Sequence, residues 1–389
     1  MEECLAIKPD LVFLWDEAWF AFATFHPIYR QRTGMHTART LRRKLKSLDY
    51  QEEYAQYQQK MQQLDPEDDA TWLDNRLIPD PSVARVRTYT THSTHKTLTS
   101  LRQGSMIHIF DQDYNQKVER PFHEAYMTHT TTSPNYQILA SLDLGRRQVE
   151  LEGYGLVHRQ LEIAMNLRTS MYNDDRFNKY FKFLVNKDMV PVQYRDSGVE
   201  SYYDPKTGFS HMEEAWRDDE FVVDPTRITL EIGNTGIDGD TFKNDILMDQ
   251  HGIQINKTSR NTVLFMINIG TTRSAAAHLI GVFQRIVNTL EFEQEGRSPG
   301  EKKIQLGKVK SLTQDLPPLP DFSYFHRAFR CATGTQVNTP EGNIREAYFL
   351  SYNDENCEYF HFEKGEMHQL MKTRELVSTS FVIPYTPGF

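Results

Sequence analysis

The sequence predicts an α/β protein of more than one domain, and three observations support this fold class. A length of 389 residues allows two or three domains and is ample for a buried core. A hydrophobic share of 39% with a net charge of −9 is typical of a soluble globular chain. The apolar run Leu11–Trp15 lacks polar alternation, which is the pattern of a strand buried on both faces of a parallel sheet.

The first third of the chain combines predicted strands with a helical segment. The Leu11–Trp15 strand ends at Asp16, and binding sites lie at the carboxyl ends of such strands. Residues 31–84 turn basic and then rich in Gln, Glu and Tyr, so we interpret them as an exposed helical insertion. Further strands are predicted at Val86–Tyr89 and Ser105–Phe110, on either side of a dense polar cluster that ends at Lys96.

The middle of the chain predicts a long helix followed by a compact α+β unit. A helical run begins after Pro134, and apolar residues recur at helical spacing from Gln148 to about Leu167. So long a helix usually leads from one domain into the next. The α+β unit consists of the stretch Arg227–Ile232, a helix near Thr241–Gln250, strands at Ile253–Ile255 and Val263–Ile269, and a helix from Ser274 to about Leu290.

These patterns divide the chain into three expected domains. Residues 1–147 form the first domain and residues 148–295 the second. Residues 296–320 are rich in Gly, Pro and Lys without a period, which marks a linker. Residues 321–389 would then form a third, aromatic-rich domain.

The composition excludes several classes of protein. The chain has 44 Lys and Arg against 53 Asp and Glu, and this acidic balance argues against a nucleic-acid partner. The cysteines Cys4, Cys331 and Cys357 are too widely spaced for a disulfide framework or a thiolate zinc site, which favours a reducing, cytoplasmic location. No apolar run approaches the roughly 18 residues of a membrane span. No segment at the N-terminus resembles a signal peptide, so we expect no membrane partner.

A metal site is the first alternative that the polar residues suggest. His92, His95 and His108 are close in sequence and imidazole is a common metal ligand. Two histidines three residues apart on a strand-to-loop segment nevertheless lack the i, i+4 helical spacing of zinc enzymes. We therefore expect no metal.

Two further groupings have simple structural explanations. The segment Gly233–Asp240 hints at a calcium loop or a phosphate cradle but lacks the ligand pattern of either. A turn in which Asp240 or Thr241 caps the next helix explains it. Arg273 lies among hydroxyl residues at a predicted helix start, where N-capping is favoured over an anion site.

The strongest constellation joins Asp16 to Lys96. A lysine that forms a Schiff base must lose a proton, and a setting of hydroxyls and histidine rather than carboxylates favours that. A carboxylate at a strand end, close to a ring nitrogen, would keep that nitrogen protonated and make the ring an electron sink. Ser93 and Thr94 could donate hydrogen bonds to a phosphate. Each element alone is ordinary, since Lys96 could be a surface lysine and Asp16 a helix cap.

Several segments together resemble the ornithine/lysine/arginine decarboxylases. Thr91–Leu98 (THSTHKTL) with Gln103–His108 (QGSMIH) is similar to the family's pyridoxal-phosphate attachment segment. Asp16–Trp19 (DEAW) with Phe25–Tyr29 (FHPIY) resembles its segment for the pyridine-nitrogen partner, and Ala125–Pro134 (AYMTHTTTSP) resembles a third family block. The similarity continues through Asp224–Thr226, Gly252–Gly270, Thr339–Pro340 and Ile383–Tyr385.

The resemblance implies a fold and a reaction. The fold would be an incomplete fold-type-I pyridoxal-phosphate-dependent transferase, similar to aspartate aminotransferase in its large domain, with a small α+β domain and a partial C-terminal α+β domain. The reaction would be decarboxylation of arginine, lysine or ornithine to carbon dioxide and the amine, with pyridoxal 5'-phosphate as cofactor. The family builds its sites across subunits, so we expect a homodimer or a higher homo-oligomer.

The resemblance also implies residue roles. Lys96 would form the Schiff base with the cofactor, and Asp16 would hold the pyridine nitrogen. The cofactor and its phosphate would be contacted by His95, which is also expected to be catalytic, and by Ser93. The remaining expected cofactor contacts are Ala18 and Trp19 in the pocket and Thr131 at the phosphate of the neighbouring subunit.

The chain departs from the family pattern at both ends. Relatives carry the first half of the cofactor domain before the Asp16 strand, and they continue beyond Phe389. We therefore expect a fragment of a longer decarboxylase with a half-built site, an exposed apolar face and an unpaired sheet edge. One alternative is a catalytically incompetent remnant that serves as an assembly or regulatory partner. Another is an aminotransferase, for which Arg260 or Arg273 could bind the substrate carboxylate.

Overall fold

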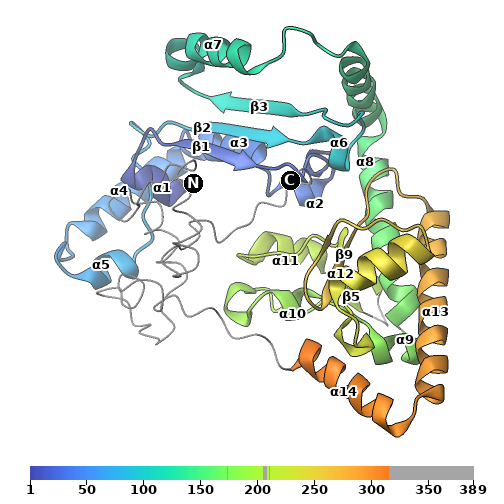
Figure 1. Ribbon diagram of the computed structural model, residues 1–389. Coiled ribbons are helices and arrows are strands. Elements are labelled where there is room, and N and C mark those ends of the chain that lie inside the picture. Colours follow the sequence, from blue (N-terminus) through green and yellow to red (C-terminus); the bar gives the residue numbers. More distant parts are fainter. Residues whose placement is uncertain (173, 205–207, 210, 315–389) are drawn as a thin grey trace, which may run out of the picture. The chain divides into compact units, whose positions relative to one another are not determined.

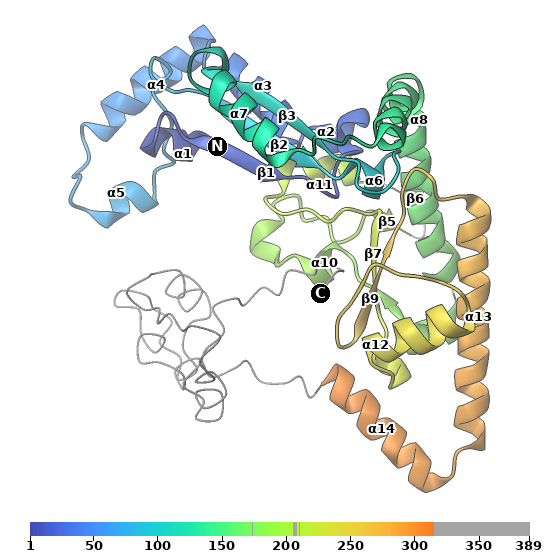
Figure 2. The ribbon, with the colours of Figure 1, turned by 45° about the horizontal axis from the view of Figure 1, so that its top comes forward.

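The computed structural model describes residues 1–314 apart from 173, 205–207 and 210. Contacts divide the chain into two units, Met1–Gln314 and Asp315–Phe389, so the expected third domain lies outside the described residues. The first unit contains a three-stranded and a four-stranded sheet with helices packed around them. Figures 1 and 2 both show helix α8 (Tyr136–Tyr172) running from the first sheet to the second. The predicted α/β class is confirmed.

The first sheet contains the three strands predicted in the first third of the chain. They are β1 (Val12–Asp16), β2 (Arg87–His92) and β3 (Met106–Asp111), in that spatial order. β1 and β2 are parallel, with Asp16 beside Thr91, whereas β3 runs antiparallel to β2. The carboxyl ends of β1 and β2 therefore lie at the same edge of the sheet.

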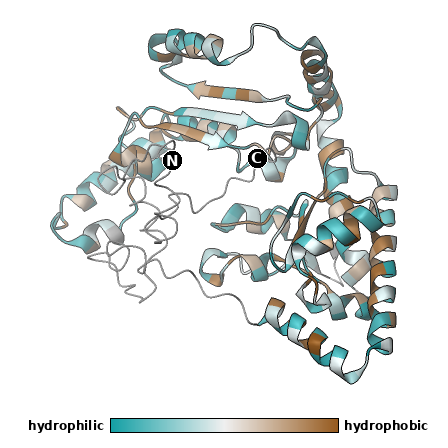
Figure 3. Ribbon diagram, viewed as in Figure 1, coloured by the Kyte–Doolittle hydropathy of each residue, from teal (hydrophilic) through white to brown (hydrophobic). Residues whose placement is uncertain are grey.

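The prediction that this first strand is buried on both faces is wrong for the part of the chain that the structure describes. Val12, Leu14 and Trp15 are 45%, 70% and 40% exposed. Among the described residues β1 pairs with β2 alone, so it is an edge strand whose apolar side chains have few neighbours. Figure 3 shows this hydrophobic strand at the margin of the sheet. Within residues 1–314 as described, β1 leaves one edge unpaired and its apolar side chains exposed, as expected.

Helices fill the segment that we interpreted as an insertion. They are α3 (Gly34–Lys44), α4 (Leu48–Met61) and α5 (Asp69–Leu73). With α1 (Glu2–Ile7) they bury a small core that includes Leu5, Leu41, Tyr50 and Val86. α3 begins very close to the sheet, since a Cβ on Gly34 would lie 2.6 Å from the Trp15 ring and 2.8 Å from the Thr90 methyl group. A glycine is therefore required where α3 meets the sheet.

The helices that follow β2 and β3 place the polar cluster and connect the sheets. α6 (Thr94–Thr97) is a short turn after β2, and α7 (Glu119–His129) follows β3. The two helical runs predicted after Pro134 form one continuous helix, α8, because no proline interrupts the sequence between them. α8 is largely exposed before Gly145 and buried on one face after it.

The second sheet is antiparallel and matches the predicted α+β unit. Its strands are β4 (Lys182–Phe183), β7 (Arg227–Glu231), β9 (Thr262–Met266) and β8 (Lys257–Thr258), in that order. The segment predicted as a strand at Ile253–Ile255 is not one, and the short strand β8 follows it. The predicted helix near Thr241 is divided into α12 (Gly239–Thr241) and a π-helical segment, Phe242–Gln250.

Long helices cover the second sheet and form the larger core. α13 (Arg273–Gly296) packs Leu279, Phe283 and Ile286 into the core that the second sheet and α8 share. The segment that we assigned to a linker contains α14 (Pro299–Thr313), which begins with a capping box of Ser298 and Glu301. No helix in the described ranges is long and apolar enough to cross a bilayer.

Buried polar contacts join the segment after β1 to the second half of the unit. Tyr29, in α2 (Pro27–Arg30), is fully buried and its hydroxyl donates to Asp224 at 2.8 Å. Burial, followed by the Asp224 charge, raises the pKa of Tyr29 well above its usual value. Arg32 donates through Nε to the carbonyl of Trp216 in α11 (Met212–Asp218) at 2.8 Å. These contacts fix the position of the loop after Asp16.

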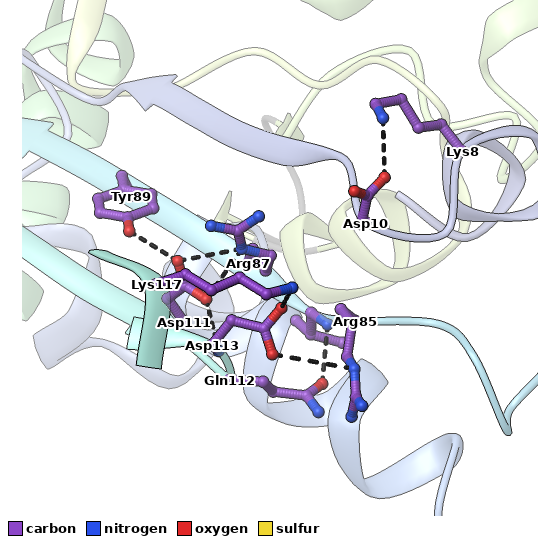
Figure 4. Close-up of polar contacts among 10 residues, drawn as sticks. Lys8, Asp10, Arg85, Arg87, Tyr89, Asp111, Gln112, Asp113 and Lys117 are labelled. Atoms are coloured by element: carbon purple, nitrogen blue, oxygen red, sulfur yellow. Dashed lines mark hydrogen bonds and ion pairs between the residues drawn. The ribbon is translucent and has the colours of Figure 1, made fainter. Parts of the chain in front are cut away.

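A second polar network holds β2 and β3 together at the end of the sheet away from Lys96. Asp111, whose side chain is fully buried, accepts a hydrogen bond from Arg87 at 3.0 Å and another from Tyr89 at 2.7 Å, as Figure 4 shows. Burial and the hydrogen bond to Asp111 raise the pKa of Tyr89. Lys117 pairs with Asp113 at 2.7 Å beside this network. Because the Asp111 carboxylate is buried, removing its partner Arg87 would leave a buried charge unpaired and would destabilise this end of the sheet.

Candidate functional site

The candidate site lies where β1 and β2 end. Asp16 is the last residue of β1, and the backbone pairing continues for one residue, since Glu17 N–H donates to the Thr91 carbonyl at 3.0 Å. β2 ends at His92, and Lys96 follows in α6. The parallel arrangement of β1 and β2 thus places the two residues of the strongest sequence constellation at one edge of the sheet.

Asp16 is exposed and held in a tight turn. Its Oδ1 accepts the backbone N–H of Ala18 at 3.0 Å. This bond fixes the carboxylate at the start of the turn and leaves its second oxygen to solvent or a ligand. Ala18 itself is half-buried and contributes this backbone contact.

Lys96 is also exposed, and its amine lies against Trp19. The distance from Lys96 Nζ to the centre of the Trp19 ring is 5.9 Å. Trp19 lies only three residues after Asp16 in the chain. The structure therefore brings the lysine to the segment that carries the carboxylate.

The backbone around Lys96 is anchored on both sides. Thr94 and Thr97 are buried. His95 Nδ1 lies 2.8 Å from the Gly104 carbonyl and must donate to it, so a neutral His95 presents Nε2 as an acceptor. The half-buried Ser93 precedes α6, and its side chain caps no helix N–H group. The Ser93 hydroxyl and His95 Nε2 therefore remain for other partners.

Thr131 lies elsewhere, on the exposed turn between α7 and α8. Its hydroxyl oxygen accepts the N–H of Ser133 at 3.0 Å. The contacts of Thr131 in the described part of the chain are local. They give no indication that it reaches Lys96 within one chain.

Sequence reasoning missed Arg227, which approaches the site from the second sheet. Arg227 donates to the Trp19 carbonyl at 2.7 Å, and its guanidinium lies 5.8 Å from the Trp19 ring centre. Lys257 Nζ lies 5.1 Å from the same ring. Both residues begin strands of the second sheet, and no local sequence signal links them to a tryptophan more than 200 residues away. The indole thus has three cations around it.

Sequence reasoning also missed Glu17 as a partner of His92. Glu17 Oε2 lies 2.9 Å from His92 Nε2, and Oε1 accepts the N–H of Gly34 at 2.6 Å. The rings of His92 and His108 have centres 4.6 Å apart. Burial, then the neighbouring His92 charge, lowers the pKa of His108. The only signal in the sequence was the pair of histidines, which suggested a metal instead.

The other polar groupings behave as structural elements. No cluster of His, Cys, Asp or Glu within the described ranges could hold a metal ion. Thr272 caps α13 through the N–H of Ala275, as N-capping predicted. Asp238, rather than the expected Asp240 or Thr241, caps the helix after Gly233, because its side chain is placed to accept the N–H of Thr241 at 3.1 Å.

The arginines considered for an aminotransferase make no described contact with the site. Arg260 donates to the carbonyl and hydroxyl of Ser311 in α14. Arg273 is exposed at the start of α13. Neither residue has a described contact with Lys96 or Trp19, whereas Arg227 contacts Trp19.

Comparisons with known proteins identify a family for this chain. Residues 76–275 match the family model "Orn/Lys/Arg decarboxylase, major domain", which covers just over half of the chain. The inducible lysine decarboxylase of Escherichia coli is 25% identical over 405 residues, which cover 96% of this chain and 46% of that protein. The lysine decarboxylase LdcA of Pseudomonas aeruginosa is 25% identical and covers 68% and 31%. The biodegradative arginine decarboxylase of E. coli is 24% identical and covers 71% and 33%.

Lysine decarboxylases are also among the solved structures that match. LdcF of Francisella novicida matches with a TM-score of 0.43 at 22% identity, over 70% of this chain and 32% of that one. Lysine decarboxylase A of P. aeruginosa matches with a TM-score of 0.47 at 19% identity, over 80% and 41%. This chain spans about a third to under half of the length of these curated relatives. On the family match and the curated relatives, the chain belongs to the Orn/Lys/Arg decarboxylase family.

Proposed function

We propose that this chain carries part of a pyridoxal-phosphate-dependent site that removes the α-carboxylate of arginine, lysine or ornithine. The observation that carries the proposal is the placement of Asp16 and Lys96 at the ends of adjacent parallel strands, with Trp19 against the lysine amine. Family membership and the names of the curated relatives support a decarboxylase of basic amino acids.

The residues at this edge fit the cofactor chemically. An aldehyde needs an accessible amine, and Lys96 is exposed. A pyridine nitrogen needs an acid, and Asp16 is exposed. Its Oδ1 accepts the N–H of Ala18, and Oδ2 has no described hydrogen bond. The Ser93 hydroxyl and His95 Nε2 lack described partners, as groups that contact a phosphate or a ring would. When bound, pyridoxal phosphate supplies a ring that takes up the electron pair left by departing carbon dioxide.

Each residue of this chain would then have a definite task. Lys96 offers its amine to the cofactor and afterwards can return a proton to the substrate Cα. Asp16 holds a proton on the ring nitrogen, which keeps the ring electron-poor. Trp19, held by the hydrogen bond from Arg227 to its carbonyl, lies beside the lysine amine and would form part of the cofactor pocket. His95 and Ser93 would contact the cofactor, and Thr131 would act from a second copy of the chain in a homodimer.

Product analysis tests this proposal. The chain is incubated with pyridoxal phosphate and, separately, arginine, lysine or ornithine, and carbon dioxide and amine are measured. Because the chain carries only part of the site, we expect slow amine formation that is abolished in Lys96→Ala and retained in Lys257→Ala, a matched lysine beside the same indole. Because Lys96 and Asp16 are both exposed, cofactor binding should be weak and saturate only at high concentration. Formation of a keto acid, or equal activity in Lys96→Ala, would contradict the proposal.

A second candidate is an assembly or regulatory partner without activity. The exposed apolar residues of β1 and of the first half of α8 favour it, including Leu14, Leu144 and Leu151 at 70%, 70% and 82% exposure. Such surfaces typically bind another polypeptide. This candidate predicts no product under the conditions above and a stable complex with a full-length family member on size-exclusion chromatography.

A further inference from the structure

Glu17 and His92 form a hydrogen-bonded pair, here called the link, close in sequence to the candidate-site residues Asp16 and Lys96. Glu17 follows Asp16, and His92 precedes Lys96 by four residues. The two side chains are in direct contact, since Glu17 Oε2 lies 2.9 Å from His92 Nε2. The other carboxylate oxygen, Oε1, accepts a hydrogen bond from the N–H of Gly34 at 2.6 Å. Both side chains are only 10% exposed, so water competes little for these bonds.

The link lies on the face of the sheet opposite to Asp16. Neighbouring residues of a strand point to opposite faces, so Glu17 lies on the α3 side and Asp16 on the other. Gly34 begins α3, and a carboxylate at a helix N-terminus is favoured by the helix dipole. One carboxylate therefore connects β1, the start of α3 and the end of β2.

The link borders a cavity. Glu17, His92 and His108 line a mostly apolar cavity of about 220 Å³, together with Phe25 and Thr94. A side chain that left the link would face this cavity. Among the described residues, α6 is otherwise anchored by the contacts of His95 with Gly104.

We propose that Glu17 and His92 are positioning residues. From the face of the sheet opposite to Asp16, they determine where Lys96 lies relative to Asp16. The link ties the two strand ends together immediately next to both groups, and it orders the turn from Ser93 to Leu98. Neither residue touches a reacting atom. The proposal rests on the proposed function for its purpose, but the ordering of the turn can be measured without cofactor.

Hydrogen exchange of the chain without cofactor provides the first test. In Glu17→Ala we expect the amides of residues 93–98 to exchange about tenfold faster, the effect of losing one charge-assisted hydrogen bond. Glu17→Gln should restore exchange to within about twofold, because its oxygen can accept from Gly34 and its amide can donate to His92. Asp111→Asn, which disturbs the network at the other end of the same sheet, is the matched control and should leave residues 93–98 unchanged.

Several results would overturn the proposal. One is an equal increase in the amide exchange rates of residues 93–98 in Glu17→Ala and Asp111→Asn, which would indicate that the whole sheet is destabilised. Another is unchanged exchange in Glu17→Ala, or wild-type amides at 93–98 that already exchange as in an unfolded chain. Failure of Glu17→Gln to restore protection would also contradict it.

Reaction with pyridoxal phosphate separates this proposal from the proposed function. After reduction with borohydride, the ratio of label on Lys96 to label on Lys257 should fall about tenfold in Glu17→Ala and recover in Glu17→Gln. If the wild-type chain is never labelled at Lys96, the proposed function fails while the exchange experiment still decides the positioning role. If wild type and Glu17→Ala are labelled alike at Lys96, the positioning role fails alone.

Discussion

Single residues in this chain show how far a local sequence can specify a site. Asp16 and Lys96 were predicted from their surroundings near two strand ends and from the segments that resemble the decarboxylase family. Their exposure was not predicted, since it depends on what lies beside β1 in space. His26 is a further case, because its neutral state follows from burial that only the fold produces.

His26 should make the stability of the protein depend on pH. Burial, then the charge of His158, lowers the pKa of His26 from 6.5 to about 4. The unfolded chain therefore binds one more proton than the folded chain between these values, and stability falls as the pH falls. We expect a loss of about 2 kcal/mol between pH 7 and pH 5 in urea unfolding. In His26→Phe most of this loss should disappear, and an unchanged slope would contradict the assignment.

Helices and strands that are determined by the periodicity of their own sequence were predicted well. Features that depend on residues far away in the sequence were predicted poorly. The strand predicted at Val263–Ile269 corresponds to β9, and the helix predicted from Ser274 to about Leu290 corresponds to α13. The burial of β1 was mispredicted because apolar composition does not reveal how many neighbours a strand has. Arg227 was missed because its partner, Trp19, belongs to a different sheet.

The packing of α13 predicts two different outcomes for phenylalanines on one helix. Phe283 is 1% exposed and touches the rings of Phe177, Phe181 and Phe265, whereas Phe292 is 78% exposed. Phe283→Ala should lower the free energy of unfolding by about 4 kcal/mol. Phe292→Ala should change it by less than about 0.5 kcal/mol. Similar losses in urea denaturation of both variants would show that α13 packs differently.

At the scale of the whole molecule, the exposed apolar surface is the main consequence of the fold. β1 has an unpaired edge among the described residues, and the first half of α8 exposes Leu144 and Leu151. Apolar surface of this kind associates in water. The expectation of a homodimer, taken from the family resemblance, gives this surface a partner.

Sedimentation tests that expectation. We predict that the sedimentation coefficient rises with protein concentration and that Leu144→Glu with Leu151→Glu weakens the association at least about tenfold, because each exposed leucine would bury substantial apolar area in a contact. Phe292→Glu, an equally exposed change on α13, is the control and should leave association unaffected. Concentration-independent sedimentation of the wild-type chain would contradict a self-associating surface.

The central claim is that the fold places the Lys96 amine beside the segment that carries Asp16, ready for a cofactor aldehyde. The most direct measurement is borohydride trapping with pyridoxal phosphate, followed by mass spectrometry of the peptides. The account predicts that Lys96 is the first lysine labelled and that Asp16→Ala changes the absorbance of the unreduced adduct without removing the label. Uniform labelling of exposed lysines, with Lys96 no faster than Lys8 or Lys60, would contradict it.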